Sequence, residues 1–190
     1  MARADRVVVD IGTGDGRVVL ARAAAEPAAL AVGIDASAPA MAGASLRADR
    51  RGPANALFLA AGVESLKTSP LAGRADLVTV LFPWGSLLRG SLGLDDRALC
   101  GIASLLAPGG RLEVLASVVP SDGVAGLASL DTTAEPAVRR AWSATGLELE
   151  TMRPSSGQEV LSSGSTWARR LGAGRPVWRL EGRRSASIDA

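Results

Sequence analysis

The sequence contains no histidine and only one cysteine, and both absences narrow the chemistry that it can perform. Without histidine, the chain lacks the side chain that most often acts as a general base near neutral pH and as a ligand for zinc. Because Cys100 has no partner within the chain, no internal disulfide can form, which fits a reducing compartment. We therefore expect no metal site and a cytoplasmic location.

Long apolar segments are also missing. Gly, Asp or Arg interrupts every apolar run before it approaches the ~18 residues of a membrane span. The first six residues lead straight into a strand-like run, so we expect neither a signal peptide nor membrane attachment. The 190 residues are 47% hydrophobic and 21% charged, which is typical of a folded globular protein. We expect a single domain over residues 1–190, frayed at 1–5 and 183–190.

The formal net charge of +2 is small, but the charged residues are unevenly distributed along the chain. Between Arg139 and Arg184, nine Arg residues stand against four Glu residues. A basic segment of this kind favours an anionic partner such as nucleic acid. Ordinary solvated faces of an arginine-rich protein would give the same count, because a binding patch requires clustering in space.

Strand-like and helix-like segments alternate along the chain. Apolar, β-branched runs predict strands at 6–11, 30–35, 56–60, 76–81, 111–119, 147–153 and 177–181. Helix formers with caps or prolines at their ends predict helices at 15–25, 39–49, 95–106 and 136–145. Residues 154–174 are predicted to be loop-rich with one short helix, and the tail from Gly182 to be frayed. This alternation predicts an α/β fold, with helices on both faces of a mainly parallel, seven-stranded sheet.

A glycine loop, Asp10-Ile11-Gly12-Thr13-Gly14-Asp15-Gly16, joins the first predicted strand to the first helix. Glycine lets the backbone turn sharply and lets a ligand approach closely. The G-x-G-x-G spacing differs from the G-x-G-x-x-G of dinucleotide binders. Asp35 ends the second strand, where a carboxylate can accept both hydroxyls of a ribose, and Glu64 follows the third, near an expected adenine. This pattern resembles the Rossmann-like class I methyltransferases, whose cofactor S-adenosylmethionine carries a sulfonium and an amino group and no phosphate.

Two tryptophans lie in segments that point to a target site. Trp84 follows the fourth strand in Leu81–Gly90, where Phe82 stands at a position that is polar in many amino-methylating enzymes. Pro83 stiffens this turn, and the Trp84 ring offers a flat face for stacking, unless it is a core residue at the sheet edge. Trp167 lies in Ser163–Leu171 beside hydroxyls and paired arginines, a combination that suits a flipped base next to phosphates.

An amphipathic helix with its tryptophan packed inward and its arginines solvated would also explain the segment around Trp167. If both tryptophans are exposed and available for stacking, Trp84 and Trp167 would clamp one base between them. Trp142 and Trp178 lie in a predicted helix and a predicted strand, so we assign them to packing.

Taken together, three segments resemble the Kam-type aminoglycoside-resistance 16S rRNA methyltransferases. They are Gly12–Gly16, the run Phe-Pro-Trp-Gly-Ser-Leu-Leu-Arg-Gly at 82–90, and Ser165-Thr166-Trp167-Ala168-Arg169-Arg170-Leu171. The resemblance extends from Val7 to about Leu180. It implies methyl transfer from S-adenosylmethionine, which leaves S-adenosylhomocysteine, to N1 of the adenine at nucleotide 1408 in the decoding-site helix of the 30S subunit, and hence aminoglycoside resistance. We expect the protein to be a monomer.

The resemblance also implies roles for individual residues. The catalytic set comprises Trp84 and Trp167, which would sandwich the flipped adenine, and Ser165, which would position cofactor or base. Apart from the resemblance, we hypothesise that a backbone carbonyl near Pro83 or Phe82 holds the exocyclic amine, which adds Pro83 to the set. The rRNA phosphates would be met by Arg89, Arg169, Arg170 and Arg175. The cofactor would be bound by Asp10, Gly12, Thr13, Gly14, Asp35, Ala36, Gly62, Val63, Glu64 and Leu81.

Two other functions remain compatible with the sequence. A small-molecule methyltransferase with the same cofactor core would not depend on Arg169, Arg170 or Arg175. A cofactor-binding protein that binds rRNA with weak activity would bind 30S subunits without methyl transfer.

Overall fold

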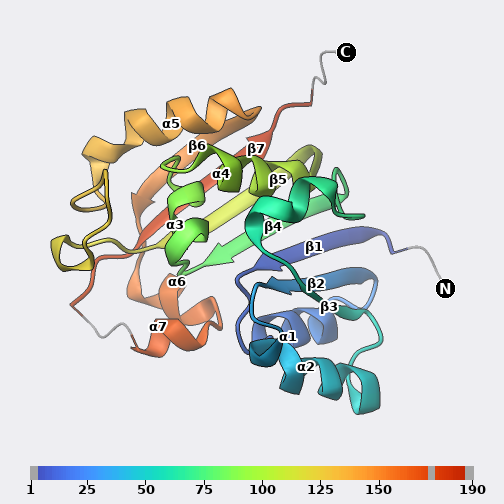
Figure 1. The fold of residues 1–190 in the computed structure, drawn as a ribbon. Coiled ribbons are helices and arrows are strands. Elements are labelled where there is room, and N and C mark those ends of the chain that lie inside the picture. Colours follow the sequence, from blue (N-terminus) through green and yellow to red (C-terminus); the bar gives the residue numbers. More distant parts are fainter. Residues whose placement is uncertain (1–3, 171–173, 187–190) are drawn as a thin grey trace.

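The computed structural model describes residues 4–170 and 174–186. At its centre is a seven-stranded sheet with the order β3-β2-β1-β4-β5-β7-β6 (Figure 1). The strands are β1 (Arg6–Ile11), β2 (Ala29–Asp35), β3 (Ala56–Ala60), β4 (Ala75–Leu81), β5 (Leu106–Ala116), β6 (Leu147–Pro154) and β7 (Trp178–Arg184). The first five strands run parallel, whereas β7 is antiparallel to both of its neighbours, β5 and β6. The predicted α/β class with a mainly parallel, seven-stranded sheet is confirmed.

Helices cover both faces of the sheet (Figure 1). On one face lie α1 (Arg17–Ala25) and α2 (Ala38–Arg51), and on the other lie α3 (Gly85–Ser91), α4 (Asp96–Leu105) and α5 (Glu135–Ala144). The short elements are α6 (Gly157–Ser162), α7 (Thr166–Arg170) and the 3₁₀ helices η1 (Val63–Thr68), η2 (Pro120–Asp122) and η3 (Thr132–Ala134). None of the helices in the described part of the chain has the length and apolar character needed to cross a bilayer.

Local sequence signals set the helix starts. The Ser37 side chain accepts a hydrogen bond from the Ala40 amide at the start of α2, and Asp95 accepts one from Ala98 at the start of α4. α1 begins two residues later than predicted, because Gly16 before it has a left-handed backbone with φ of 67°. The predicted helices are therefore present, with ends displaced by only a few residues.

Other predictions were wrong in detail. α3 lies where a loop was expected, and residues 154–170 form two short helices instead of one. β5 begins at Leu106, because that residue pairs with Ala75 before a register shift. The tail was expected to fray from Gly182, yet β7 continues to Arg184, which pairs with Leu147 of β6. The expected fraying at 1–3 and 187–190 concerns residues outside the described ones.

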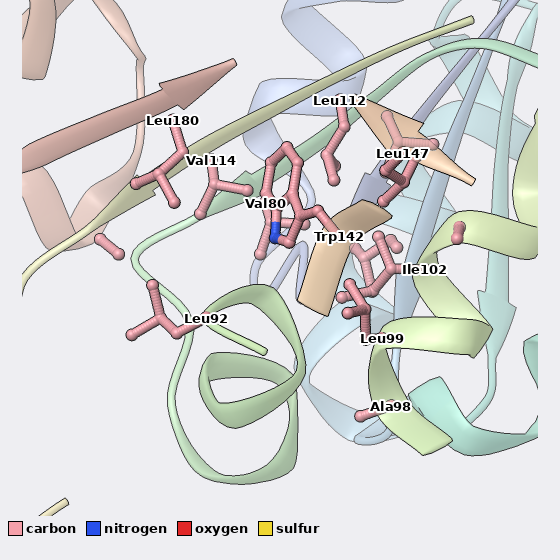
Figure 2. Close-up of a cluster of buried hydrophobic side chains, with 14 of the residues drawn as sticks. Val80, Leu92, Ala98, Leu99, Ile102, Leu112, Val114, Trp142, Leu147 and Leu180 are labelled. Atoms are coloured by element: carbon pink, nitrogen blue, oxygen red, sulfur yellow. The ribbon is translucent and has the colours of Figure 1, made fainter. Parts of the chain in front are cut away.

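Trp142 occupies the centre of the largest hydrophobic cluster. It projects from α5 and is surrounded by strand and helix side chains that include Val80, Val114 and Leu147 (Figure 2). Its side chain is completely buried, and its indole N–H donates to the equally buried carbonyl of Ser91 at 3.0 Å. Trp178 is also buried, so the assignment of both tryptophans to packing is confirmed.

We expect Trp142→Ala to lower the free energy of unfolding by about 3–5 kcal/mol, because it leaves a cavity and an unpaired carbonyl. Trp84 is 80% exposed, so Trp84→Ala should change stability by no more than about 0.5 kcal/mol. Chemical denaturation of both variants measures the difference. Equal losses of stability would contradict this description of the core.

Candidate functional site

A pocket of about 400 Å³ opens at the carboxyl ends of β1, β2 and β4. The strand order reverses beside β1, because β2 and β3 lie on one side of it and β4 and β5 lie on the other. Ligands of open α/β sheets bind at such a reversal of strand order. All ten residues predicted to bind the cofactor line this pocket, namely Asp10, Gly12, Thr13, Gly14, Asp35, Ala36, Gly62, Val63, Glu64 and Leu81.

The glycine loop forms the floor of the pocket. Gly12 and Gly14 have φ values of 73° and 55°, in the left-handed region that favours glycine. The amides of Gly12 and Thr13 donate to the Ile34 carbonyl of β2, which fixes the loop to the sheet. A Cβ at Gly12 would lie only 2.7 Å from the end of the Leu87 side chain of α3, so a larger residue there would require Leu87 to move as well as strain the backbone.

Asp35 joins the glycine loop to the next turn. One of its carboxylate oxygens accepts a hydrogen bond from the Gly14 amide and the other from the Ser37 amide, each at 2.8 Å. A carboxylate oxygen has more than one acceptor site, so Asp35 can serve both amides and a ligand hydroxyl. The geometry is therefore compatible with the predicted contact to a ribose.

Asp10 lies deeper, at the base of the pocket. The residue is 6% exposed, and its carboxyl group accepts a 2.7 Å hydrogen bond from the hydroxyl of Thr79 on β4. Burial raises the pKa of Asp10 from 3.8 to about 6, although the Thr79 hydrogen bond opposes the rise. A cation bound beside it would compensate for this burial.

The polar groups of the lining suit a cationic ligand. Four carboxylates line the pocket, those of Asp10, Asp15, Asp35 and Glu64, against the single guanidinium of Arg170. The Thr13 hydroxyl is buried and has no hydrogen-bond partner among the described residues. Such a lining would repel a pyrophosphate, whereas it fits the ammonium and sulfonium of S-adenosylmethionine and leaves a polar atom available to that ligand.

Phe82 forms an unusual turn at the end of β4. It is the one described non-glycine residue with a positive φ, 54°, a conformation that costs a bulky residue about 1–2 kcal/mol. Its amide donates to the Leu115 carbonyl at 2.7 Å, and its ring is buried with Leu115, Ala168 and Val177. This burial holds the strained turn from which Pro83 and Trp84 follow.

The four residues of the predicted catalytic set come together at the pocket. Pro83, Trp84, Ser165 and Trp167 all line it, although about 80 residues of sequence separate the two pairs. Trp84 and Trp167 are 80% and 50% exposed, which excludes the alternative in which either is a core residue. Large exposed aromatic rings beside a pocket favour a binding role over a packing role.

The four predicted rRNA-binding arginines fall into two pairs. Arg170 lines the pocket with its guanidinium 5.5 Å from the Trp167 ring centre, and Arg169 beside it is exposed. Arg89 instead donates to the carbonyls of Ala125 and Leu94, and Arg175 binds Ser117 and forms an ion pair with Asp122. Arg89 and Arg175 therefore hold the segment between β5 and α5, a role that the sequence analysis did not predict. Leu171, the end of the second tryptophan motif, lies outside the described residues.

Three further residues complete the site although their sequence positions indicated no role. Leu87 lines the pocket from α3, where a loop had been expected. Asp15 and Thr166 lie within the quoted motifs but were assigned no role, and their side chains form a 2.9 Å hydrogen bond across the pocket. The sequence contains no signal for a contact between residues so far apart. The only indication was that each residue lies inside one of the quoted motifs.

Burial of Asp10 makes stability depend on pH. Because the pKa of Asp10 is raised in the folded state, the folded state binds this proton more tightly than the unfolded state, and the resulting stabilisation is complete only below the unfolded pKa of 3.8. This stabilisation is lost as pH rises through about 6, so we expect this group to contribute about 2 kcal/mol less stability at pH 7 than at pH 4. Urea denaturation across this range should show the loss in the unliganded protein and a flatter profile in Asp10→Asn. Identical profiles would contradict the prediction.

Comparison with known proteins agrees with this architecture. A curated 16S rRNA (adenine(1408)-N(1))-methyltransferase of Streptoalloteichus hindustanus is 34% identical over 181 residues, covering 90% of this chain and 82% of that protein. A tryptophan-to-alanine mutant of the 16S rRNA (adenine(1408)-N(1))-methyltransferase from Catenulisporales acidiphilia, solved with its cosubstrate SAM, superposes with a TM-score of 0.87. It is 30% identical and covers 100% of this chain and 90% of that one. The methyltransferase KamB superposes with a TM-score of 0.85 at 32% identity, covering 97% of this chain and 90% of its own.

A family model extends the agreement to nearly the whole sequence. The model described as NpmA, 16S rRNA (adenine(1408)-N(1))-methyltransferase, matches residues 1–185. The chain belongs to the 16S rRNA (adenine(1408)-N(1))-methyltransferase family.

Proposed function

We propose that this protein transfers a methyl group from S-adenosylmethionine to N1 of adenine 1408 in 16S rRNA of the 30S subunit, and thereby confers aminoglycoside resistance. Family membership supports the reaction. The observation that carries the proposal is the pair of exposed tryptophans, Trp84 and Trp167, on the rim of an acidic pocket at the end of β1 and β4. A small metabolite does not require two large aromatic faces open to solvent, whereas a base extruded from RNA does.

The cofactor supplies a methyl group on a positively charged sulfur, and the pocket residues bind and orient it. Asp10 would lie beside a positive charge of the ligand, and Asp35 would accept hydrogen bonds from its ribose. Gly62, Val63 and Glu64 would border its adenine, and the left-handed backbone of Gly12 and Gly14 lets the ligand approach the loop.

The target base needs orientation more than proton transfer. The N1 lone pair of an unpaired adenine lies in the ring plane and attacks the methyl carbon directly. As the N–C bond forms, the electrons of the C–S bond return to sulfur. No base is required, which is consistent with a sequence that has no histidine. Trp84 and Trp167 would fix the ring plane, Ser165 would help to position the base, and a carbonyl at Phe82 or Pro83 would accept the exocyclic amine.

The arginines would contribute to docking in two ways. Arg169 and Arg170 flank Trp167 and would meet phosphates next to the flipped base. Arg89 and Arg175 would act through the segment that they hold between β5 and α5, with their remaining N–H groups directed at the rRNA backbone. We further propose that the chain acts as a monomer and a single domain in the bacterial cytoplasm, where 30S subunits are found.

The direct test is incubation of the protein with S-adenosylmethionine and 30S subunits from a susceptible bacterium, followed by reverse transcription across the decoding helix. A methyl group on N1 blocks Watson–Crick pairing, so we expect a strong stop opposite the target adenine. Binding of 30S subunits without a stop would favour a weakly active rRNA-binding protein. Methylation of free metabolites with no stop would favour a small-molecule methyltransferase.

We expect Trp84→Ala and Trp167→Ala each to reduce the methylation rate by about 5–150-fold, the range that corresponds to a stacking energy of about 1–3 kcal/mol per base. Cofactor affinity, measured by calorimetry, should be nearly unchanged, because both rings lie at the rim. Leu57→Ala is the matched control, since Leu57 is 49% exposed on β3 and does not line the pocket. Normal methylation by both tryptophan variants would exclude the clamp.

Cofactor binding should depend on the ionisation of Asp10. With a pKa of about 6, its carboxylate is mostly ionised at pH 7 and mostly protonated at pH 5. We therefore expect the affinity for S-adenosylmethionine to fall about tenfold between these pH values, because a neutral carboxyl loses its attraction for the cationic ligand. In Asp10→Asn the affinity should be low at pH 7 and should vary little with pH. A wild-type affinity that is constant from pH 7 to pH 5 would show that Asp10 does not serve the cofactor.

A further inference from the structure

The helix that carries Trp167 has little apolar attachment to the rest of the molecule. α7 has five residues, Thr166–Arg170, and of these only Ala168 is buried. A helix of this length has no appreciable stability of its own. An alanine side chain is also the smallest apolar group that can be buried, so its contact with the cluster around Phe82 contributes little. Half of the Trp167 surface is exposed, so its orientation depends on further contacts of α7.

A polar contact provides the second attachment. The hydroxyl of Thr166, the residue before Trp167, donates a 2.9 Å hydrogen bond to the carboxylate of Asp15. These two residues are 151 positions apart in the sequence. Asp15 lies between Gly14 and Gly16 in the glycine loop, so the bond joins α7 directly to the loop that forms the floor of the cofactor pocket.

Asp15 is well suited to act as an anchor. Its carboxylate also accepts hydrogen bonds from the backbone and side chain of Arg17. Partial burial alone would raise the pKa of Asp15, but the hydrogen bonds from Thr166 and Arg17 hold it below its usual value, so the group is ionised at neutral pH. An ionised acceptor strengthens the hydrogen bond that it receives. The glycine loop is itself fixed through the Ile34 carbonyl and through Asp35.

We propose that Thr166 is a positioning residue, whose hydrogen bond to Asp15 sets the place of the Trp167 ring relative to the cofactor loop. The inference rests on the proposed function and deepens it. The base stacked on Trp167 must present N1 to the methyl group with an error well below 1 Å, and the Thr166–Asp15 bond is the short connection between the two binding surfaces. The hydrogen bond between Thr166 and Asp15 would contact neither reacting atom. Its loss should therefore affect turnover more than cofactor binding.

Thr166→Val tests this directly, because it preserves shape and removes the hydroxyl. We expect kcat on 30S subunits to fall about tenfold, the factor at the lower end of the range for loss of one hydrogen bond to a charged acceptor. Cofactor affinity should stay nearly constant, and Thr166→Ser should restore turnover. Thr145→Val is the matched control, because it removes a 2.8 Å threonine hydrogen bond at the end of α5, away from the pocket. It should leave kcat unchanged.

A second measurement needs no substrate. In a Trp84→Phe background, Trp142 and Trp178 are buried, so acrylamide quenches mainly Trp167. Adding Thr166→Val should increase quenching, and Thr166→Ser should not. The proposal is overturned if Thr166→Val leaves quenching or turnover unchanged, or if Thr166→Ser fails to restore turnover. It is also overturned if Thr166→Val lowers cofactor affinity by the same factor as the rate.

The two proposals fail in different ways. Absence of methylation by the wild-type protein would defeat the proposed function. The quenching experiment would still decide whether Thr166 fixes Trp167.

Discussion

A carboxyl group placed at the end of a central strand, away from water, is the constraint around which the site is arranged. Asp10 is the last residue but one of β1, where the strand order reverses, and its carboxyl group accepts a hydrogen bond from the neutral Thr79 hydroxyl. Among the described residues no cationic side chain forms an ion pair with Asp10, and Arg22 acts on it only through its charge, so the folded protein holds a region of negative potential ready for a positive ligand. The glycine loop leads from this carboxyl and is tied to β2, which places the remaining acidic side chains around the same space.

The sequence predicted well those features that depend on local patterns. Apolar runs that end in Gly or Asp mark the parallel strands, because a strand buried on both faces is continuously apolar. α3 could not be predicted in the same way. It is seven residues long and the residue that precedes it, Trp84, provides no side-chain cap, so it owes its formation to packing. Gly90 allows this packing, since a Cβ there would lie 2.6 Å from Ala98 of α4. The extension of β7 to Arg184 likewise depends on two flanking strands and not on its own residues.

The site shows the same division. Glycines, strand-end acids and unusual tryptophan segments carry enough pattern for their meeting at one pocket to be predicted. The roles of Arg89 and Arg175 could not be predicted from the sequence. Both guanidinium groups were expected to face solvent, but they bind loop carbonyls and an aspartate far along the chain. The left-handed backbone at Phe82 was equally hidden, since aromatic residues seldom adopt it and the burial of its ring compensates for it only in the folded protein.

The position of β7 has a consequence for the order in which the protein becomes functional during its synthesis. β6 pairs only with β7 within the described sheet, and β7 in turn joins it to β5. The segment between them, which includes Trp167, is therefore closed at both ends only after the chain has been translated through Arg184. The parallel strands and the glycine loop are made earlier. A nascent chain can thus form the glycine loop and the parallel strands around the pocket before the segment that carries Trp167 is fixed to the sheet.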